Sequence, residues 1–313
     1  MIAFTIRRIL MAIPTLWIAL TIIFVLVRVI PGDPTAAVMG DYMSEESIRV
    51  LRKQMGIDQP LIAQYGRYLY DFVRGDFGSS LVTGSPVIDE LRSALPHTLQ
   101  LTLCSILVGM VTGIPLGLLL ALRRNTIWDY LGRFFSLAGL SFPSFYIAIL
   151  FILFFSIKLD LLPVMGVGKV GDFGDRVRHL ILPSLSLGLL MMSYLTRITR
   201  SAMLDVLNAD YIRTAHSKGL KNLKVIAKHA FKNASVSIVT VLGMYVGILI
   251  GSSVMTEIIF NRPGLGSLIV GSMLNRDYTT ITSIMTIYAA IVIFVNLITD
   301  LSYGFIDPRI RYE

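Results

Sequence analysis

Long apolar runs alternate with polar segments along this chain, and the length of each run predicts what it forms. A helix crosses a bilayer with about 20 predominantly apolar residues. Six runs reach approximately that length, and they cover Ile9 to Ile30, Thr98 to Leu122, Phe134 to Ile157, Leu180 to Thr196, Ala234 to Thr256 and Ile281 to Phe305. The pattern therefore predicts an all-α membrane protein with six transmembrane helices. The first run is too long for a cleaved signal sequence, so we expect it to remain as the first span.

Proline and glycine are placed inside three of these runs. Pro143 lies in the third run, where it is expected to kink the helix, and Pro183 lies near the start of the fourth. Gly109, Gly113 and Gly117 recur every four residues on the second run. This spacing puts them on one helix face, where small residues let a second helix approach closely.

Composition and charge support a membrane protein and argue against a nucleic-acid-binding one. Hydrophobic residues make up 54% of the chain and charged residues 15%, against about 25% charged in typical soluble proteins. The net charge of +8 is explained by the excess of Lys and Arg that cytoplasmic loops of membrane proteins carry. Basic residues gather at both ends, after the second run and after the fourth, which predicts that both termini are cytoplasmic.

Three segments then face outward, and the first of them is long enough to fold. Residues 31–97 are predicted to form a small helical extracytoplasmic domain, with one helix from Ser44 to about Gln54 and another from Pro60 to about Arg74. The domain is either a packed cap on the bundle or a docking surface for an extracytoplasmic partner. In the last outer segment, Pro263-Gly264 opens an apolar helix that is too short to span the membrane and is expected to be interfacial or re-entrant.

The segment from Asp210 to Ala234 is a basic loop between two spans. Asn208 or Asp210 is expected to cap a helix of about Ala209 to Lys218, and Gly219 follows where a helix can end in the left-handed conformation. Asn222 is expected to cap a second helix that runs back into the fifth span. From these residues alone, the loop is either a rigid docking element for a soluble partner or a plain positively charged loop near anionic lipid.

This loop resembles the EAA loop of ATP-binding-cassette importer permeases, in the branch that imports dipeptides, oligopeptides, nickel or glutathione. The residues that carry the resemblance are Tyr211, Arg213, Thr214, Ala215, Lys218, Gly219, Leu220, His229, Asn233 and Ala234. Further motifs of the branch follow in order, namely Pro31-Gly32-Asp33-Pro34, Gly56 to Leu61, Gly75 to Ser80, Pro263 to Gly266 and Asp307 to Tyr312. Thr279 departs from the proline that is usual at its position. The resemblance extends over the whole chain.

The resemblance implies a type I importer permease subunit in a bacterial cytoplasmic (inner) membrane. It implies a heterodimer with a second, homologous permease, two ATP-binding subunits and an extracytoplasmic solute-binding protein. The expected cargo is a di- or oligopeptide, with nickel, glutathione or another small solute as the alternative. The expected divisions are residues 1–30 for the first span, 31–97 for the outer domain and 98–313 for a five-helix core with the coupling loop at 197–233. Residues expected to couple to the ATPase are Tyr211, Arg213, Thr214, Ala215, Lys218, Gly219, Leu220, Lys221 and Lys224.

No motif for chemistry on this chain is visible. The sequence has neither a G-x-x-x-x-G-K-[ST] phosphate loop nor an H-E-x-x-H zinc motif. We therefore expect no catalytic residue, no metal and no cofactor here, with ATP and Mg²⁺ held by the partner subunits. Glu257 and Asp300 lie at span ends, where structural pairing is the expected role. A secondary transporter remains the alternative class, although inverted repeats and buried coupling charges are not visible.

Overall fold

The structure, a computed structural model, describes residues 2–29, 46, 53 and 58–306. These residues form helices and connecting turns, with no β-strand among them. The chain divides into two compact units, one containing Thr98–Arg262 with both chain ends and one containing Ile9–His97 and Pro263–Phe294. The helix predicted from Ser44 to Gln54, and the motifs at Pro31 to Pro34, Gly56 to Ile57 and Asp307 to Tyr312, lie outside the described residues.

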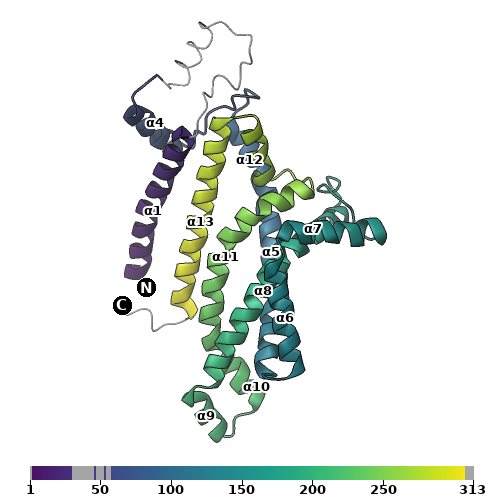
Figure 1. Ribbon diagram of the computed structural model, residues 1–313. Coiled ribbons are helices and arrows are strands. Elements are labelled where there is room, and N and C mark those ends of the chain that lie inside the picture. Colours follow the sequence, from purple (N-terminus) through teal and green to yellow (C-terminus); the bar gives the residue numbers. More distant parts are fainter. Residues whose placement is uncertain (1, 30–45, 47–52, 54–57, 307–313) are drawn as a thin grey trace. The chain divides into compact units, whose positions relative to one another are not determined.

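Five helices in the described part of the chain are long and apolar enough to cross a membrane, and a bent pair makes a sixth candidate. The five are α1 (Ile2–Val29), α5 (Val87–Leu122), α8 (Phe173–Leu207), α11 (Lys232–Ile259) and α13 (Tyr278–Ile306) (Figure 1). This confirms the predicted all-α membrane fold. The helices run past the ends of the apolar runs, because a helix satisfies its own backbone hydrogen bonds in water as well as in lipid.

The third predicted span is two helices rather than one kinked helix. α6 (Ile127–Ser141) ends before Phe142, α7 (Ser144–Phe151) begins after Pro143, and their axes differ by 100°. Phe142 is extended, with φ −97° and ψ 131°, as the residue before a proline prefers. Pro143 is the N-cap residue of α7, where its missing N–H costs no helical hydrogen bond. α7 then widens into η2 (Ile152–Lys158), a π-helical segment.

The glycine stripe on α5 packs against α8, as the spacing predicts. A Cβ atom on Gly113 would lie 2.7 Å from the carbonyl oxygen of Met192, and one on Gly117 would lie 2.6 Å from that of Thr196. Thr196 also donates a hydrogen bond to the carbonyl of Gly113 at 3.3 Å. The two backbones are therefore in direct contact, and no side chain larger than hydrogen fits between them.

The core of the first unit lies between α5, α8 and α11. Its fully buried side chains include Leu101 on α5, Leu187, Met191 and Leu195 on α8, and Leu249 on α11. Other faces of the same helices leave large apolar residues exposed, for example Leu103, Leu107, Val111, Met244 and Ile248. A helix with a packed face and an exposed apolar face is expected where lipid replaces water as the solvent.

The second unit contains most of α1, the first part of α5, the segment between them, the helix that follows Pro263-Gly264 and the first part of α13. Its core is formed by Val87, Leu91, Ala94, Leu265, Ile269 and Ile284. The helix predicted after Pro60 is confirmed as α4 (Leu61–Arg74), and the short helix predicted after Pro263-Gly264 is α12 (Leu265–Leu274). Gly75, with φ +70°, ends α4 in the left-handed conformation.

The two acids at span ends are paired, which supports a structural role for each. Thr98 Oγ1 donates a hydrogen bond to Glu257 Oε1 at 2.7 Å, and Glu257 is fully buried. Arg8 Nη1 lies 2.8 Å from Asp300 Oδ2. A buried carboxylate that accepts such bonds escapes most of the penalty of leaving water.

Candidate functional site

The first helix of the basic loop is α9 (Asp210–Ser217), close to its predicted bounds. The predicted cap is wrong, because Ala209 occupies the N-cap position and no side chain accepts a capping hydrogen bond there. Asn208 instead ends α8. Asp210 lies in the first turn of α9, where a carboxylate still interacts favourably with the positive end of the helix dipole.

Gly219 ends this helix as the sequence predicts, with φ +74°. The N–H of Leu220 bonds to the carbonyl of Ala215 at 3.4 Å, and the N–H of Gly219 bonds to that of His216 at 2.9 Å. These two bonds form a Schellman motif, in which a left-handed residue satisfies the last carbonyls of a helix. Leu220 then packs onto the apolar cluster that contains Ala215, which is the hydrophobic contact that accompanies the motif.

The second helix returns to the membrane without a break. α10 (Asn222–Lys224) continues through the π-helical segment η3 (Val225–Phe231) into α11. Asn222 is the first helical residue and Lys221 is the N-cap, with no capping side chain, so the predicted Asn222 cap is wrong. The predicted helix, glycine turn and returning helix are otherwise present.

The loop shares an apolar core with the ends of three spans. Ile212 and Ala215 point from α9 into this core, which we call the loop core. Its buried members are Ala121 from α5, Ala202 and Met203 from α8, Ile212 and Ala215 from α9, Val225 and Ala230 from η3, and Ala234 from α11. Because these side chains pack together, a force on α9 is transmitted directly to α5, α8 and α11.

Most residues expected to couple to the ATPase lie on the exposed side of the loop. Those exposed are Tyr211, Arg213, Thr214, Lys218, Gly219, Lys221 and Lys224, whereas Ala215 is buried in the loop core and Leu220 is half-buried against it. Tyr211 is held in place by Asn233, whose Nδ2 donates to the Tyr211 hydroxyl at 3.1 Å. The exposed set forms a surface, and the two apolar residues support it from within.

Leu223 is a candidate residue that the sequence analysis missed. Its side chain is 78% exposed on α10, between the exposed residues Asn222 and Lys224. The available signal was a leucine between Asn222 and Lys224, in a basic segment at the turn of the loop. An exposed leucine at the tip of a charged loop offers apolar surface that a pocket on another protein could bury.

A buried ion pair joins α6 to α8 close to the loop core. Arg200 donates to both oxygens of Asp129, from Nε at 2.6 Å and from Nη2 at 2.8 Å. The backbone N–H of Asn125 adds a third bond at 3.0 Å, and Arg133 Nε lies 3.7 Å away. Asp129 is fully buried. The fork geometry of Arg200 fixes the angle as well as the distance between the two helices.

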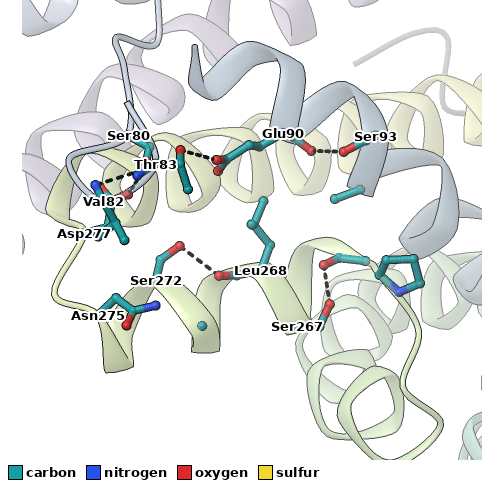
Figure 2. A pocket seen from close by; sticks show the side chains of 14 residues that line it. Ser80, Val82, Thr83, Glu90, Ser93, Ser267, Leu268, Ser272, Asn275 and Asp277 are labelled. Carbon is teal, nitrogen blue, oxygen red and sulfur yellow. Dashed lines mark hydrogen bonds between the residues drawn. The ribbon is translucent and has the colours of Figure 1, made fainter. Parts of the chain in front are cut away.

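A second candidate site is a pocket in the other unit, with a cavity volume of about 430 Å³ and a lining surface that is mostly apolar. We call it the polar pocket after the hydroxyl, amide and carboxylate side chains among its lining residues. Figure 2 shows its lining side chains, with Thr83 donating to Glu90 at 3.0 Å. The lining residues are Ser80, Val82, Thr83, Glu90, Ser93, Ala94, Pro263, Gly264, Ser267, Leu268, Gly271, Ser272, Asn275 and Asp277. Two carboxylates and no lysine or arginine are among these described lining residues. The pocket therefore suits a cationic group.

Asp277 anchors one wall of this pocket. It is buried and accepts from Ser80 Oγ at 2.5 Å and Thr280 Oγ1 at 2.8 Å. Its charge is thereby spread over hydroxyl donors. Glu90 is half-buried and is the other carboxylate of the lining, where it accepts a hydrogen bond from Thr83. Across the described residues, no group of three or more His, Cys, Asp or Glu side chains is arranged to hold a metal ion.

Comparison with known proteins agrees with this architecture. The family described as binding-protein-dependent transport system inner membrane component matches residues 113–312, and the corresponding N-terminal family matches residues 1–102. The chain is 39% identical to the glutathione transport system permease protein GsiC of Escherichia coli (strain K12) and, equally, to that of Salmonella paratyphi A. Both alignments cover 100% of each chain.

The fold also matches a solved importer structure. An inward-facing structure of the MetNI methionine ABC transporter aligns with a TM-score of 0.59 and 17% identity, over 71% of this chain and 98% of that one. At this identity the match shows the fold, which is that of a type I importer permease. Together with the full-length relatives, it places an all-helical, multi-pass chain in the inner membrane. The chain belongs to the binding-protein-dependent transport system inner membrane components, as an ATP-binding-cassette importer permease of the peptide and nickel branch.

Proposed function

We propose that this permease imports a small peptide, and that glutathione, itself a tripeptide, is the first solute to test. The observation that carries the proposal is the 39% identity, over the full length of both chains, to glutathione transport system permeases. Dipeptides and longer oligopeptides are the remaining candidates of the same chemistry. Nickel belongs to the same branch, but no observation on this chain favours it over a peptide.

In this proposal the chain supplies the pathway and the partner subunits supply the energy. Residues 31–97 face outward, the loop at 197–233 faces inward and both termini are cytoplasmic. A second, homologous permease pairs with this chain, and ATP with Mg²⁺ is bound by two ATP-binding subunits. Closure of those subunits pushes the loop, and the loop core passes the displacement to α5, α8 and α11. The pathway then switches between two packings of rigid helices.

The function is tested by reconstituting the complete transporter in lipid vesicles with its solute-binding protein. ATP-dependent uptake of labelled glutathione, dipeptides, oligopeptides and nickel is measured in parallel. Uptake of a peptide that stops when ATP is withheld supports the proposal. Uptake of nickel alone identifies the other cargo of the branch. Uptake that continues without ATP points to a secondary transporter.

Leu223 is expected to anchor the loop in an ATP-binding subunit. Burying a leucine side chain contributes about 1.5–3 kcal/mol, so Leu223→Asp should lower uptake by about tenfold or more through loss of ATPase docking. The measurement is uptake together with the amount of ATP-binding subunit that co-purifies with the chain. Leu274→Asp is the matched control, since Leu274 is 81% exposed at the end of α12, in the other unit. Equal losses from both variants would argue against a specific role for Leu223.

The polar pocket is proposed to receive a lysine or arginine of the solute-binding protein. Glu90→Lys reverses the charge of one lining residue and should reduce uptake several-fold. It should not change the ATPase rate measured in the absence of the binding protein. Asp89→Lys makes the same charge change on the next residue, which is exposed, does not line the pocket and lies 4.0 Å from Arg92. A titration of binding protein against uptake distinguishes the two variants. The proposal fails if Asp89→Lys has the larger effect.

A further inference from the structure

α4 carries an apolar stripe that the described residues leave uncovered. Ile62 is 86% exposed, Val73 is 83% exposed and Tyr70 is also exposed. These residues are eight and three positions apart, which puts them on one face of a helix with 3.6 residues per turn. We call Ile62, Tyr70 and Val73 the apolar stripe. A surface helix normally packs such a face against a core. We therefore expect another apolar surface to cover the stripe.

The opposite face of α4 is seated on two spans of its own unit. The Tyr65 hydroxyl lies 2.6 Å from Thr21 Oγ1 on α1, and the Tyr65 ring meets that of Phe24 edge-on at 5.3 Å. The Tyr68 hydroxyl lies 2.7 Å from Thr286 Oγ1 on α13. Figure 1 shows α4 lying across the end of α1. The two tyrosines therefore fix how far α4 stands from the ends of both spans.

Both contacts lie at the same distance from the ends of their spans. Thr21 is eight residues before Val29, the last residue of α1, and Thr286 is eight residues after Tyr278, the first residue of α13. At 1.5 Å per residue, each contact is about 12 Å from the end of its span. The apolar face of an interfacial helix is buried about 5–10 Å into the boundary between headgroups and acyl chains. The two tyrosine contacts, on two separate spans, therefore lie towards the span ends, as expected for a helix at the interface.

The polar edge of α4 is arranged as interfacial helices require. The guanidinium of Arg74 lies over the Tyr70 ring at 4.3 Å, and Arg67 Nε lies 3.7 Å from Asp71. Long basic side chains of this kind cover an apolar helix while their charges stay in water. On α1, Ile22, next to the Thr21 contact, is also exposed, as expected for a span surface that faces lipid.

We propose that α4 is an interfacial helix whose apolar stripe is covered by the bilayer, at the boundary between headgroups and acyl chains. Its assignment to the outer leaflet rests on the topology given under the proposed function. Its contact with lipid does not depend on which solute the transporter carries. Here α4 anchors the segment between α1 and α5 to the membrane surface, and it holds α1 against α13 from outside the helix bundle.

Site-directed fluorescence in the complete transporter tests this assignment. Cys104 is the only cysteine of the chain, so Cys104→Ser gives a background for single labels. Bimane is attached at Ile62→Cys or Val73→Cys on the stripe, and at Arg67→Cys on the polar side as the matched control. The transporter is placed in nanodiscs of phosphatidylethanolamine and phosphatidylglycerol. Quenching by a lipid with a doxyl group near its headgroup is compared with quenching by aqueous iodide.

Lipid quenching is expected to be about threefold stronger at both stripe positions than at position 67, with the reverse order for iodide. Equal iodide quenching at all three positions would show that the stripe faces water and would overturn the proposal. Protection from both quenchers would show that protein covers the stripe, either residues 30–57 or a partner subunit, and would overturn it as well. Quenching is measured without any transported solute. The outcome therefore does not depend on whether the transporter carries glutathione.

Discussion

Replacing Gly219 by valine is expected to lower uptake by about tenfold while the chain still inserts and assembles. At φ +74° a residue with a Cβ is strained by about 1–2 kcal/mol, and a β-branched residue is among the least tolerant of this conformation. The space around Gly219 is open, with no atom within 4 Å of the position that a Cβ would occupy. Backbone strain is therefore the whole effect, and it opens the Schellman motif that positions Leu220 on the loop core.

Two controls make this result specific. Gly219→Asn should retain most of the uptake, because asparagine tolerates the left-handed conformation better than other residues with a side chain. Gly75→Val imposes the same strain at φ +70°, also with open space around it, but at the end of α4 rather than in the loop. Uptake and ATPase rate are measured together on vesicles. Normal uptake by Gly219→Val would sink the idea that the loop is a rigid coupling element.

Removing the carboxylate of Asp129 is expected to destabilise the chain more than any surface substitution. Asp129→Leu leaves the Arg200 guanidinium, with 17% of its side chain exposed, without its bidentate partner. Breaking a buried pair from one side costs about 3–5 kcal/mol, because the remaining charge is desolvated and unpaired. The measurement is the melting temperature of the purified complex, followed by size-exclusion of the fluorescent chain.

The double variant Asp129→Leu/Arg200→Met separates charge from packing. If the cost arises from the unpaired guanidinium, the second substitution should recover most of the lost melting temperature. Asp205→Leu removes an exposed carboxylate from α8 and should have little effect. A double variant as unstable as Asp129→Leu alone would mean that the ion pair contributes through geometry that an apolar pair cannot replace.

The sequence predicts the spans and the coupling loop well, because both depend on local chemistry. Apolar length decides where a helix crosses lipid, and Gly219 decides where α9 ends. The caps were wrong because Ala209 and Lys221 already have the extended backbone that a helix start needs, so no side chain is required. The break at Pro143 is 100°, larger than a kink, because Phe142 before the proline is extended and separates the chain into two helices.

The rest of the site depends on residues that are distant in the sequence. The polar pocket is lined by two segments, residues 80–94 and 263–277, which are far apart in the sequence. Neither segment has a sequence pattern that predicts a pocket. Leu223 stood outside the family motif, and its 78% exposure follows from the direction in which α10 leaves Lys221. The Asp129–Arg200 pair joins residues 71 positions apart in the sequence. Such contacts are decided by tertiary packing, which periodicity does not report.

The contact between the α5 and α8 backbones limits how the pathway can open. Gly113 and Gly117 hold the two backbones in direct contact, so we expect α5 and α8 to move together when the loop core is displaced. A displacement of the loop would then be carried along both helices, because neither can move far relative to the other. The 100° break between α6 and α7 is where we expect the first unit to accommodate this movement.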